Sequence, residues 1–220
     1  MPEESTAGES VNLWRNADHA INYLEKRSSI PRRSEAYDVL LLEILPARVD
    51  RVLDLGTGDG NVLELVLDAR PGASGVGLDF QDEMLHRARD RFAGRPGVEI
   101  RKHDMDDSLT PDLGQFDVVV SSFAIHHLEP RRQMDLYGEV FDRLLPGGVF
   151  ANVEHVASTT PRRHDEFLYA IGSSPEQDDP SNKLVPVATH LAGLEASGFA
   201  DAECLWKWRE LAVVTGTKPA

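Results

Sequence analysis

The sequence predicts an α/β fold in one domain. Arg51–Leu55 is a short apolar run of the kind that forms a buried strand, and Gly56, Gly58 and Gly60 follow it at every second position. Asn61 to Asp68 then carries the apolar residues of the first turns of a helix. A strand, a glycine turn and a helix in this order bring backbone N–H groups close to a nucleotide-like ligand.

The amino-acid composition narrows the classes of molecule that this protein is expected to bind. With 220 residues the chain is long enough to bury a full core, although its 41% of apolar residues is somewhat low for a globular protein. A net charge of −14 argues against a surface that follows nucleic-acid phosphates. Cys204 is the one cysteine, which excludes an intramolecular disulfide and a cysteine-rich metal site. With no membrane-length apolar run and an acidic start unlike a signal peptide, a soluble cytoplasmic protein without metal is expected.

The other elements follow from the same patterns along the chain. Further strands are expected at 75–79, 98–102, 116–121, 149–156, 199–206 and 211–218, and helices at 11–26, 34–46, 61–70, 81–92, 130–145 and 187–197. Ser34 is expected to cap the second helix. Residues 1–10 are polar and small, and a disordered tail is expected there.

The spacing of the glycines decides between ligands. A dinucleotide fingerprint has the spacing G-x-G-x-x-G, whereas here it is G-x-G-x-G and Asn61 occupies the place of the third glycine. No lysine follows, as a P-loop would require. Asp54 lies two residues before the first glycine, where an acid suits a cationic ligand better than a pyrophosphate. A tight turn that binds nothing is the structural alternative.

Residues 54–60 resemble motif I of the class I S-adenosylmethionine (SAM) methyltransferases, D-L-G-x-G-x-G. Leu144 to Gly148 resembles the L-x-P-G-G turn of that family, and the last two apolar runs resemble the antiparallel hairpin that completes its sheet. The resemblance covers residues 51–156 strongly and the hairpin moderately. It implies a Rossmann-like fold with a seven-stranded, mostly parallel sheet, an antiparallel last strand and helices on both faces.

The resemblance also implies a SAM site. Asp79 ends the second strand about 20 residues after the glycine turn, where an acid accepts hydrogen bonds from ribose hydroxyls. A helix N-cap or a solvent-facing acid is the alternative. Asp104 and Met105 match the family's adenine-binding element. Phe80 and Met84 are candidates to cover the two faces of the adenine ring, and a place in the hydrophobic core is the alternative for both. The expected cofactor-binding residues are Asp54, Gly56, Thr57, Gly58, Asp79, Phe80, Met84, Asp104, Met105 and Phe123.

Histidines near the ends of the fourth and fifth strands are candidates for acid–base chemistry, because histidine is the usual general base near neutral pH. His126 and His127 are adjacent and point in different directions, so at most one is expected to face a site, and we select His127. His155 is the second candidate catalytic residue. A purely structural role is the alternative for His127. Arg162, just past the fifth strand, is a candidate substrate contact, with a solvated helix start as the alternative.

Two helices before the first strand resemble the N-terminal lid of small-molecule methyltransferases. The expected division is a tail at 1–10, a lid at 11–47 and a SAM-binding domain at 48–220. Trp14, Tyr23 and Tyr37 are candidates to close over SAM and substrate, and packing between the helices is the alternative.

The C-terminal part, from Thr189 to Trp206, is also similar to the branch that contains carboxy-SAM synthase. In that enzyme a basic segment before this helix holds the extra carboxylate. The corresponding residues here, 178–183, are acidic and include no arginine, so ordinary SAM is expected.

The sequence thus predicts a SAM-dependent methyltransferase that acts on a small molecule by in-line displacement. The alternatives are a tRNA or protein methyltransferase, a carboxy-SAM synthase-like enzyme, an NAD-linked oxidoreductase, and a non-catalytic regulatory subunit that binds SAM or S-adenosylhomocysteine (SAH). A homodimer is compatible with the sequence.

Overall fold

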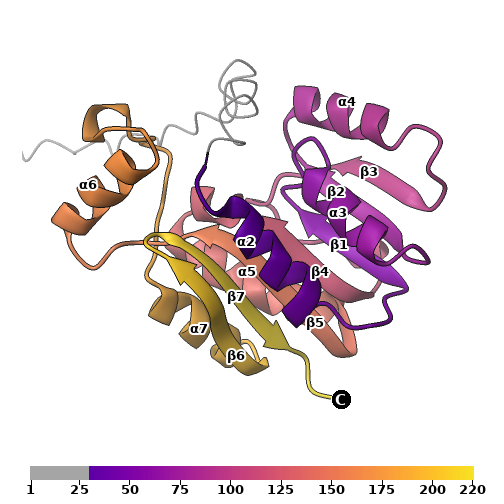
Figure 1. The fold of residues 1–220 in the computed structure, drawn as a ribbon. Coiled ribbons are helices and arrows are strands. Elements are labelled where there is room, and N and C mark those ends of the chain that lie inside the picture. Colours follow the sequence, from indigo (N-terminus) through magenta and orange to yellow (C-terminus); the bar gives the residue numbers. More distant parts are fainter. Residues whose placement is uncertain (1–29) are drawn as a thin grey trace, which may run out of the picture.

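The computed structural model describes residues 30–220. Trp14, Tyr23, the expected tail and the expected first helix lie outside the described residues. Seven strands form one sheet in the order β3-β2-β1-β4-β5-β7-β6 (Figure 1). Their bounds are Arg51–Leu55 (β1), Ser74–Asp79 (β2), Val98–Lys102 (β3), Phe116–Ser122 (β4), Leu144–His155 (β5), Ala200–Trp208 (β6) and Leu211–Thr217 (β7).

The direction of the strands confirms the predicted fold class. β1 to β5 pair in parallel, and β7 pairs antiparallel with β5 on one side and β6 on the other. The central strands are buried on both faces, as their near-continuous apolar runs predict. The sheet is therefore mostly parallel, with the last strand running against the others.

Helices cover both faces of the sheet (Figure 1). Apolar residues of α2 and α3 join one buried cluster, and those of α5 and α7 join a second cluster on the other face. The helices span Arg33–Val39 (α2), Asn61–Ala69 (α3), Asp82–Arg91 (α4), Pro130–Arg143 (α5), Pro161–Ala170 (α6) and Val187–Ala196 (α7). In residues 30–220, no helix combines the length and apolar character that crossing a bilayer requires.

Two boundaries differ from the sequence prediction. Ser34 does not cap α2: the N-cap is Arg32, in a left-handed conformation with no side-chain cap bond, and the helix continues beyond Val39 as a π-helical turn at Leu40–Ile44. β5 begins at Leu144 rather than Val149, because Leu144 already pairs with Phe116 of β4 before the register shifts. At β5, pairing with β4 overrides the local turn signal.

The strand order reverses between β1 and β4, since the chain winds outward to β3 on one side and to β5 on the other. Ligands of open α/β sheets bind at the carboxyl ends of the strands beside such a reversal. The ends of β1, β2, β4 and β5 meet at this edge.

Candidate active site

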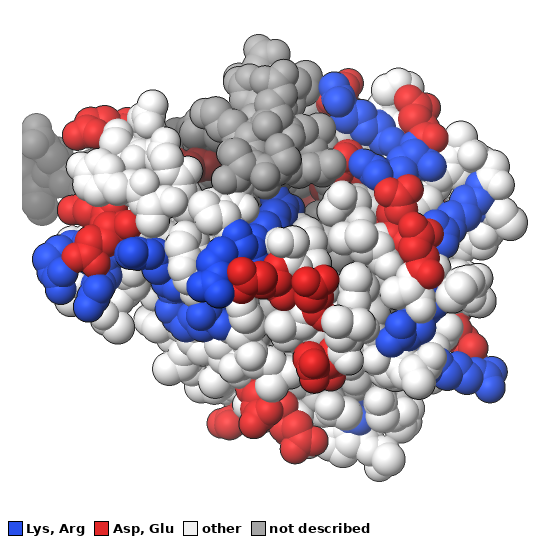
Figure 2. Space-filling model, in the orientation of Figure 1, with Lys and Arg blue, Asp and Glu red and all other residues white. Residues whose placement is uncertain are grey.

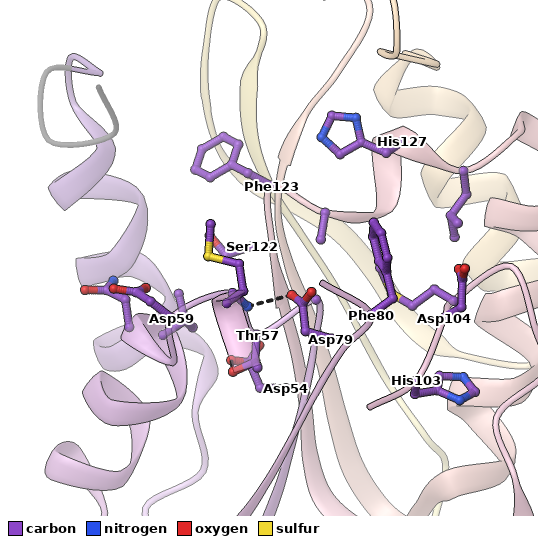
Figure 3. Close-up of a pocket in the computed structure, with 18 of the residues that line it drawn as sticks. Asp54, Thr57, Asp59, Asp79, Phe80, His103, Asp104, Ser122, Phe123 and His127 are labelled. Atoms are coloured by element: carbon purple, nitrogen blue, oxygen red, sulfur yellow. Dashed lines mark hydrogen bonds between the residues drawn. The ribbon is translucent and has the colours of Figure 1, made fainter. Parts of the chain in front are cut away.

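A cavity lies at the carboxyl ends of β1, β2 and β4 and is called the cofactor cavity here. All ten residues expected to bind the cofactor line it: Asp54, Gly56, Thr57, Gly58, Asp79, Phe80, Met84, Asp104, Met105 and Phe123. Figure 3 shows Asp79 near the centre, Phe80 and Asp104 to its right, and Phe123 and His127 at the top of the view. Segments far apart in the sequence therefore converge on one space.

The glycine turn and the end of β2 are fixed to each other. Gly58 N–H donates to Asp79 Oδ2 at 2.9 Å, and Gln81 N–H donates to Oδ1 at 2.9 Å (Figure 3). The N-cap of α4 is Gln81, so Asp79 is not the cap that was its structural alternative. Burial raises the pKa of this carboxyl, and backbone N–H groups of Gln81, Gly58 and Phe80 act in the opposite direction. A carboxylate only accepts hydrogen bonds and is a partner for O–H donors. A ligand with two neighbouring hydroxyls suits it.

Asp54 is the most deeply buried acid of the cofactor cavity. Thr57 Oγ1 donates to its Oδ2 at 2.7 Å, while Oδ1 is buried without a hydrogen-bond partner among residues 30–220. Burial raises the pKa of Asp54 to about 7. An incompletely bonded buried carboxyl favours a cationic or donor-bearing ligand. The residues present thus fit SAM, which carries a sulfonium and an ammonium.

Because the folded protein holds the Asp54 proton up to about pH 7, stability is expected to fall as pH rises between about 4 and 7. In that range the unfolded chain has already lost the proton, so each pH unit costs as much as about 1.4 kcal/mol. Asp54→Asn is expected to remove this slope and to keep the Thr57 bond. Urea unfolding of the cofactor-free protein at pH 5, 6, 7 and 8 measures it. Equal slopes in the two proteins would assign the pH dependence to other groups.

A second cavity adjoins the first and is called the histidine cavity. Phe123 and His127 line both cavities. His126 and His155 line the histidine cavity too, with ring centroids 5.5 Å apart. The expectation that only one of the adjacent histidines faces a site is therefore wrong. Residues 125–127 form a 3-10 turn rather than a strand, and alternation between opposite faces does not apply.

His126 is held by a buried acid. Its Nδ1 lies 2.5 Å from Glu154 Oε1, and Asn152 Nδ2–H donates to Glu154 Oε2 at 3.0 Å. Burial raises the pKa of Glu154 and lowers the pKa values of His126 and His127 well below their usual range. Both rings are therefore neutral and weakly basic at pH 7.

His155 is held differently. Its Nε2 lies 2.9 Å from Glu210 Oε2, and His164 Nδ1 lies 3.0 Å from the same oxygen. Burial acts to raise the pKa of Glu210, but hydrogen bonds from His155, Ser158 and His164 hold it below its usual value. Glu210 is thus ionised and accepts the Nε2–H of His155. The Nδ1 lone pair remains available, since none of residues 30–220 hydrogen-bonds to it.

The remaining sequence candidates lie apart from this group. Tyr37 Oη bonds to Ser122 Oγ at 3.1 Å and accepts from Arg33 Nε at 2.6 Å, which ties α2 to the end of β4. Arg33 itself lines the cofactor cavity. Arg162 is exposed on α6 and pairs with Glu166, and it lines neither cavity.

Sequence reasoning did not find Glu210 or Asp178. Glu210 lies in the turn between β6 and β7, and Asp178 lies in the loop after α6, where acids are common and no spacing marks them. They join the site only through the pairing of β5 with β7 and the placement of His164.

Comparisons with known proteins agree with this geometry. A family model described as "Methyltransferase domain" matches residues 52–148. Trans-aconitate 2-methyltransferase from Rhizobium rhizogenes is 36% identical over 113 residues, which are 51% of this chain and 41% of that protein. The chain spans about half the length of the curated relatives that it matches.

Solved structures share the fold. An O-methyltransferase family protein from Burkholderia thailandensis aligns over 94% of this chain and 62% of its own, with a TM-score of 0.72 and 18% identity. Human N-acetylserotonin methyltransferase in complex with SAM aligns over 98% of this chain and 61% of its own, with a TM-score of 0.64 and 15% identity.

Proposed function

We propose that this chain is a class I SAM-dependent methyltransferase that transfers the methyl group of SAM to a small-molecule acceptor bound in the histidine cavity. The observation that carries the proposal is the junction of the two cavities at Phe123 and His127. In-line displacement requires an acceptor directly beside the reactive methyl group, in a space from which water is excluded.

The cofactor-cavity residues have separate parts in this proposal. Asp79 would hold the ribose, Asp104 and Met105 the adenine, and Phe123 the methionine portion, while Arg33 suits its carboxylate. Bound SAM supplies a methyl group on a positively charged sulfur. Asp54, which is bonded to Thr57 of the glycine turn, would favour the positive charge of the bound cofactor. Tyr37, through its bond to Ser122, would couple α2 to the strand end that both ligands share.

Of the two candidate bases, His155 is better suited. Its partner Glu210 is an ionised carboxylate that orients the ring and stabilises the imidazolium, whereas burial lowers the pKa of His127. His127 is proposed as a contact at the junction of the cavities. His155 would take the proton that an O–H or N–H acceptor loses.

Charge distribution supports a small acceptor over a nucleic acid. The net charge of −14 opposes phosphate binding overall, and on the face drawn in Figure 2 the basic side chains lie beside acidic ones. Phosphate-binding surfaces require clustered Lys and Arg. The tRNA alternative predicts salt-dependent binding of RNA, and our proposal predicts none beyond non-specific association.

Calorimetric titration with SAM and SAH tests the cofactor site. Asp79→Ala is expected to weaken both by about 10- to 100-fold, the effect of losing hydrogen bonds to a charged group. Asp82→Ala is the matched control, because Asp82 begins the next helix but is exposed and pairs with Lys102. An unchanged affinity in Asp79→Ala, with melting temperature preserved, would remove Asp79 from the site.

A further inference from the structure

The histidine cavity carries an unusual charge for a substrate site. Asp178 and Asp179 line it, and the ionised Glu210 is fully buried behind His155. None of the lining residues that the structure describes is Lys or Arg. A cavity with carboxylates on several sides favours cations and opposes anions, because its low-dielectric walls strengthen their field.

The two lining acids are held in place by the loop that carries them. Asp178 Oδ2 lies 3.1 Å from His164 Nε2, and Asp178 Oδ1 accepts from Asp179 N–H at 3.0 Å. Asp179 Oδ1 accepts from Ser181 N–H and Oγ–H at 2.8 and 2.6 Å. These bonds preorganise the carboxylates before any ligand arrives.

His164 contacts two of these acids. His164 lies between Glu210 and Asp178, and their hydrogen bonds outweigh its partial burial and raise its pKa. Arg163 is directed to Glu166, and Arg209 donates to the Glu166 carbonyl. One histidine cation thus faces two acids directly.

The rest of the lining is apolar. Phe123, Phe167, Leu168, Ile171 and Leu211 form this part of the wall. Such a surface suits a ring or short hydrocarbon body, and aromatic faces also attract cations. His155 adjoins this wall, because its ring centroid lies 5.1 Å from that of Phe167.

From these observations, and resting on the proposed function, we infer that the acceptor is a hydrophobic amine: an apolar ring or chain with one protonatable nitrogen and no carboxylate or phosphate. The ammonium form binds beside the acids and loses a proton to His155 Nδ1. The nitrogen lone pair then forms the N–CH₃ bond as the C–S bond of SAM breaks. Sulfur keeps the electron pair, which gives SAH, and the product leaves as a methylammonium.

Binding to the SAH-loaded protein tests the inference without requiring turnover. Three probes share one skeleton: phenethylamine, 2-phenylethanol and 3-phenylpropanoate. By calorimetry at pH 7, the amine is expected to bind at least about tenfold more tightly than the carboxylate, with the alcohol between them. Its affinity should fall with added salt, as expected for charge pairing.

The double variant Asp178→Asn/Asp179→Asn is expected to lose most of the preference for the amine. Asp82→Asn/Asp90→Asn, which removes two exposed acids of α4, is the matched control and should keep it. Melting temperatures report whether each variant folds. If the acidic-loop variant does not fold, the three probes and the salt series on the unmodified protein still decide the question.

Preferred binding of the carboxylate, equal binding of all three probes, no binding of any, or an unchanged preference in the folded Asn variant would overturn the inference. Amine binding with the expected preference but without methyl transfer would contradict the proposed function and leave the amine site standing. The two failures are thus distinguishable.

Discussion

Replacement of His155 by alanine is expected to lower the rate of methyl transfer by about 10²- to 10⁴-fold at pH 7, the range for loss of a general base. Among residues 30–220, His155 is the only histidine lining the histidine cavity whose Nε2 lies beside an ionised, buried carboxylate, that of Glu210. SAM affinity should not change, because His155 does not line the cofactor cavity. Single-turnover rates and calorimetry on the same preparation separate the two effects.

The pH profile distinguishes a base from a structural residue. At high pH an amine acceptor loses its proton to water without a base. The loss of transfer rate in His155→Ala should therefore become smaller at high pH, whereas a variant with a distorted cavity would transfer the methyl group slowly at every pH. Glu210→Gln should show a smaller deficit in kcat, since it keeps the shape of the side chain but removes the charge that supports the imidazolium. His86→Ala, an exposed histidine of α4, is the control. Transfer at the normal rate in His155→Ala would eliminate this base.

Gly56→Ala is expected to destabilise the cofactor-free protein by about 2–5 kcal/mol and to abolish SAM binding. Gly56 has φ of 66°, and a Cβ there would lie 2.3 Å from Ala124 Cβ and 3.3 Å from Met105 Cε. The segment after β4 would have to move, and Phe123 and His127, which both cavities share, belong to that segment.

Gly58 provides an internal control, because its φ of 55° is similar but a Cβ there would meet nothing within 4 Å. Gly58→Ala should therefore show only the backbone cost, about 1–2 kcal/mol. Urea unfolding of both variants without cofactor gives the comparison. Equal losses would mean that backbone strain, and not the contact with Ala124, sets the requirement for glycine at 56.

The sequence is informative where structure is local. The glycine turn, the strand before it and Asp79 lie within one βαβ unit, so their spacing predicts how they meet in space, and the seven-stranded fold is confirmed. Glu210 could not be predicted in the same way. It reaches His155 from 55 residues away, across an antiparallel pairing whose register depends on the whole sheet.

Arg162 is a case in which closeness in sequence to a strand end did not predict a place in the site. It follows β5 closely, as a substrate contact would, but the first turn of α6 directs it outward to Glu166. Thr160, which caps that helix by accepting from Arg163 N–H, sets the orientation. A helix exposes some of its side chains to solvent, and proximity to a strand end does not decide which.

The reversal of strand order has a consequence for how such a protein can change. The ends of β1 and β2 and the segments that follow β1, β2 and β3 supply most of the cofactor cavity, while the end of β5, α6 and the loop after α6 supply most of the histidine cavity. The two halves share only the segment after β4. Substitutions or insertions in the later half of the chain can therefore alter which acceptor is chosen while the older task of holding the methyl donor is preserved. New specificity can evolve in this half without renewed selection on the other.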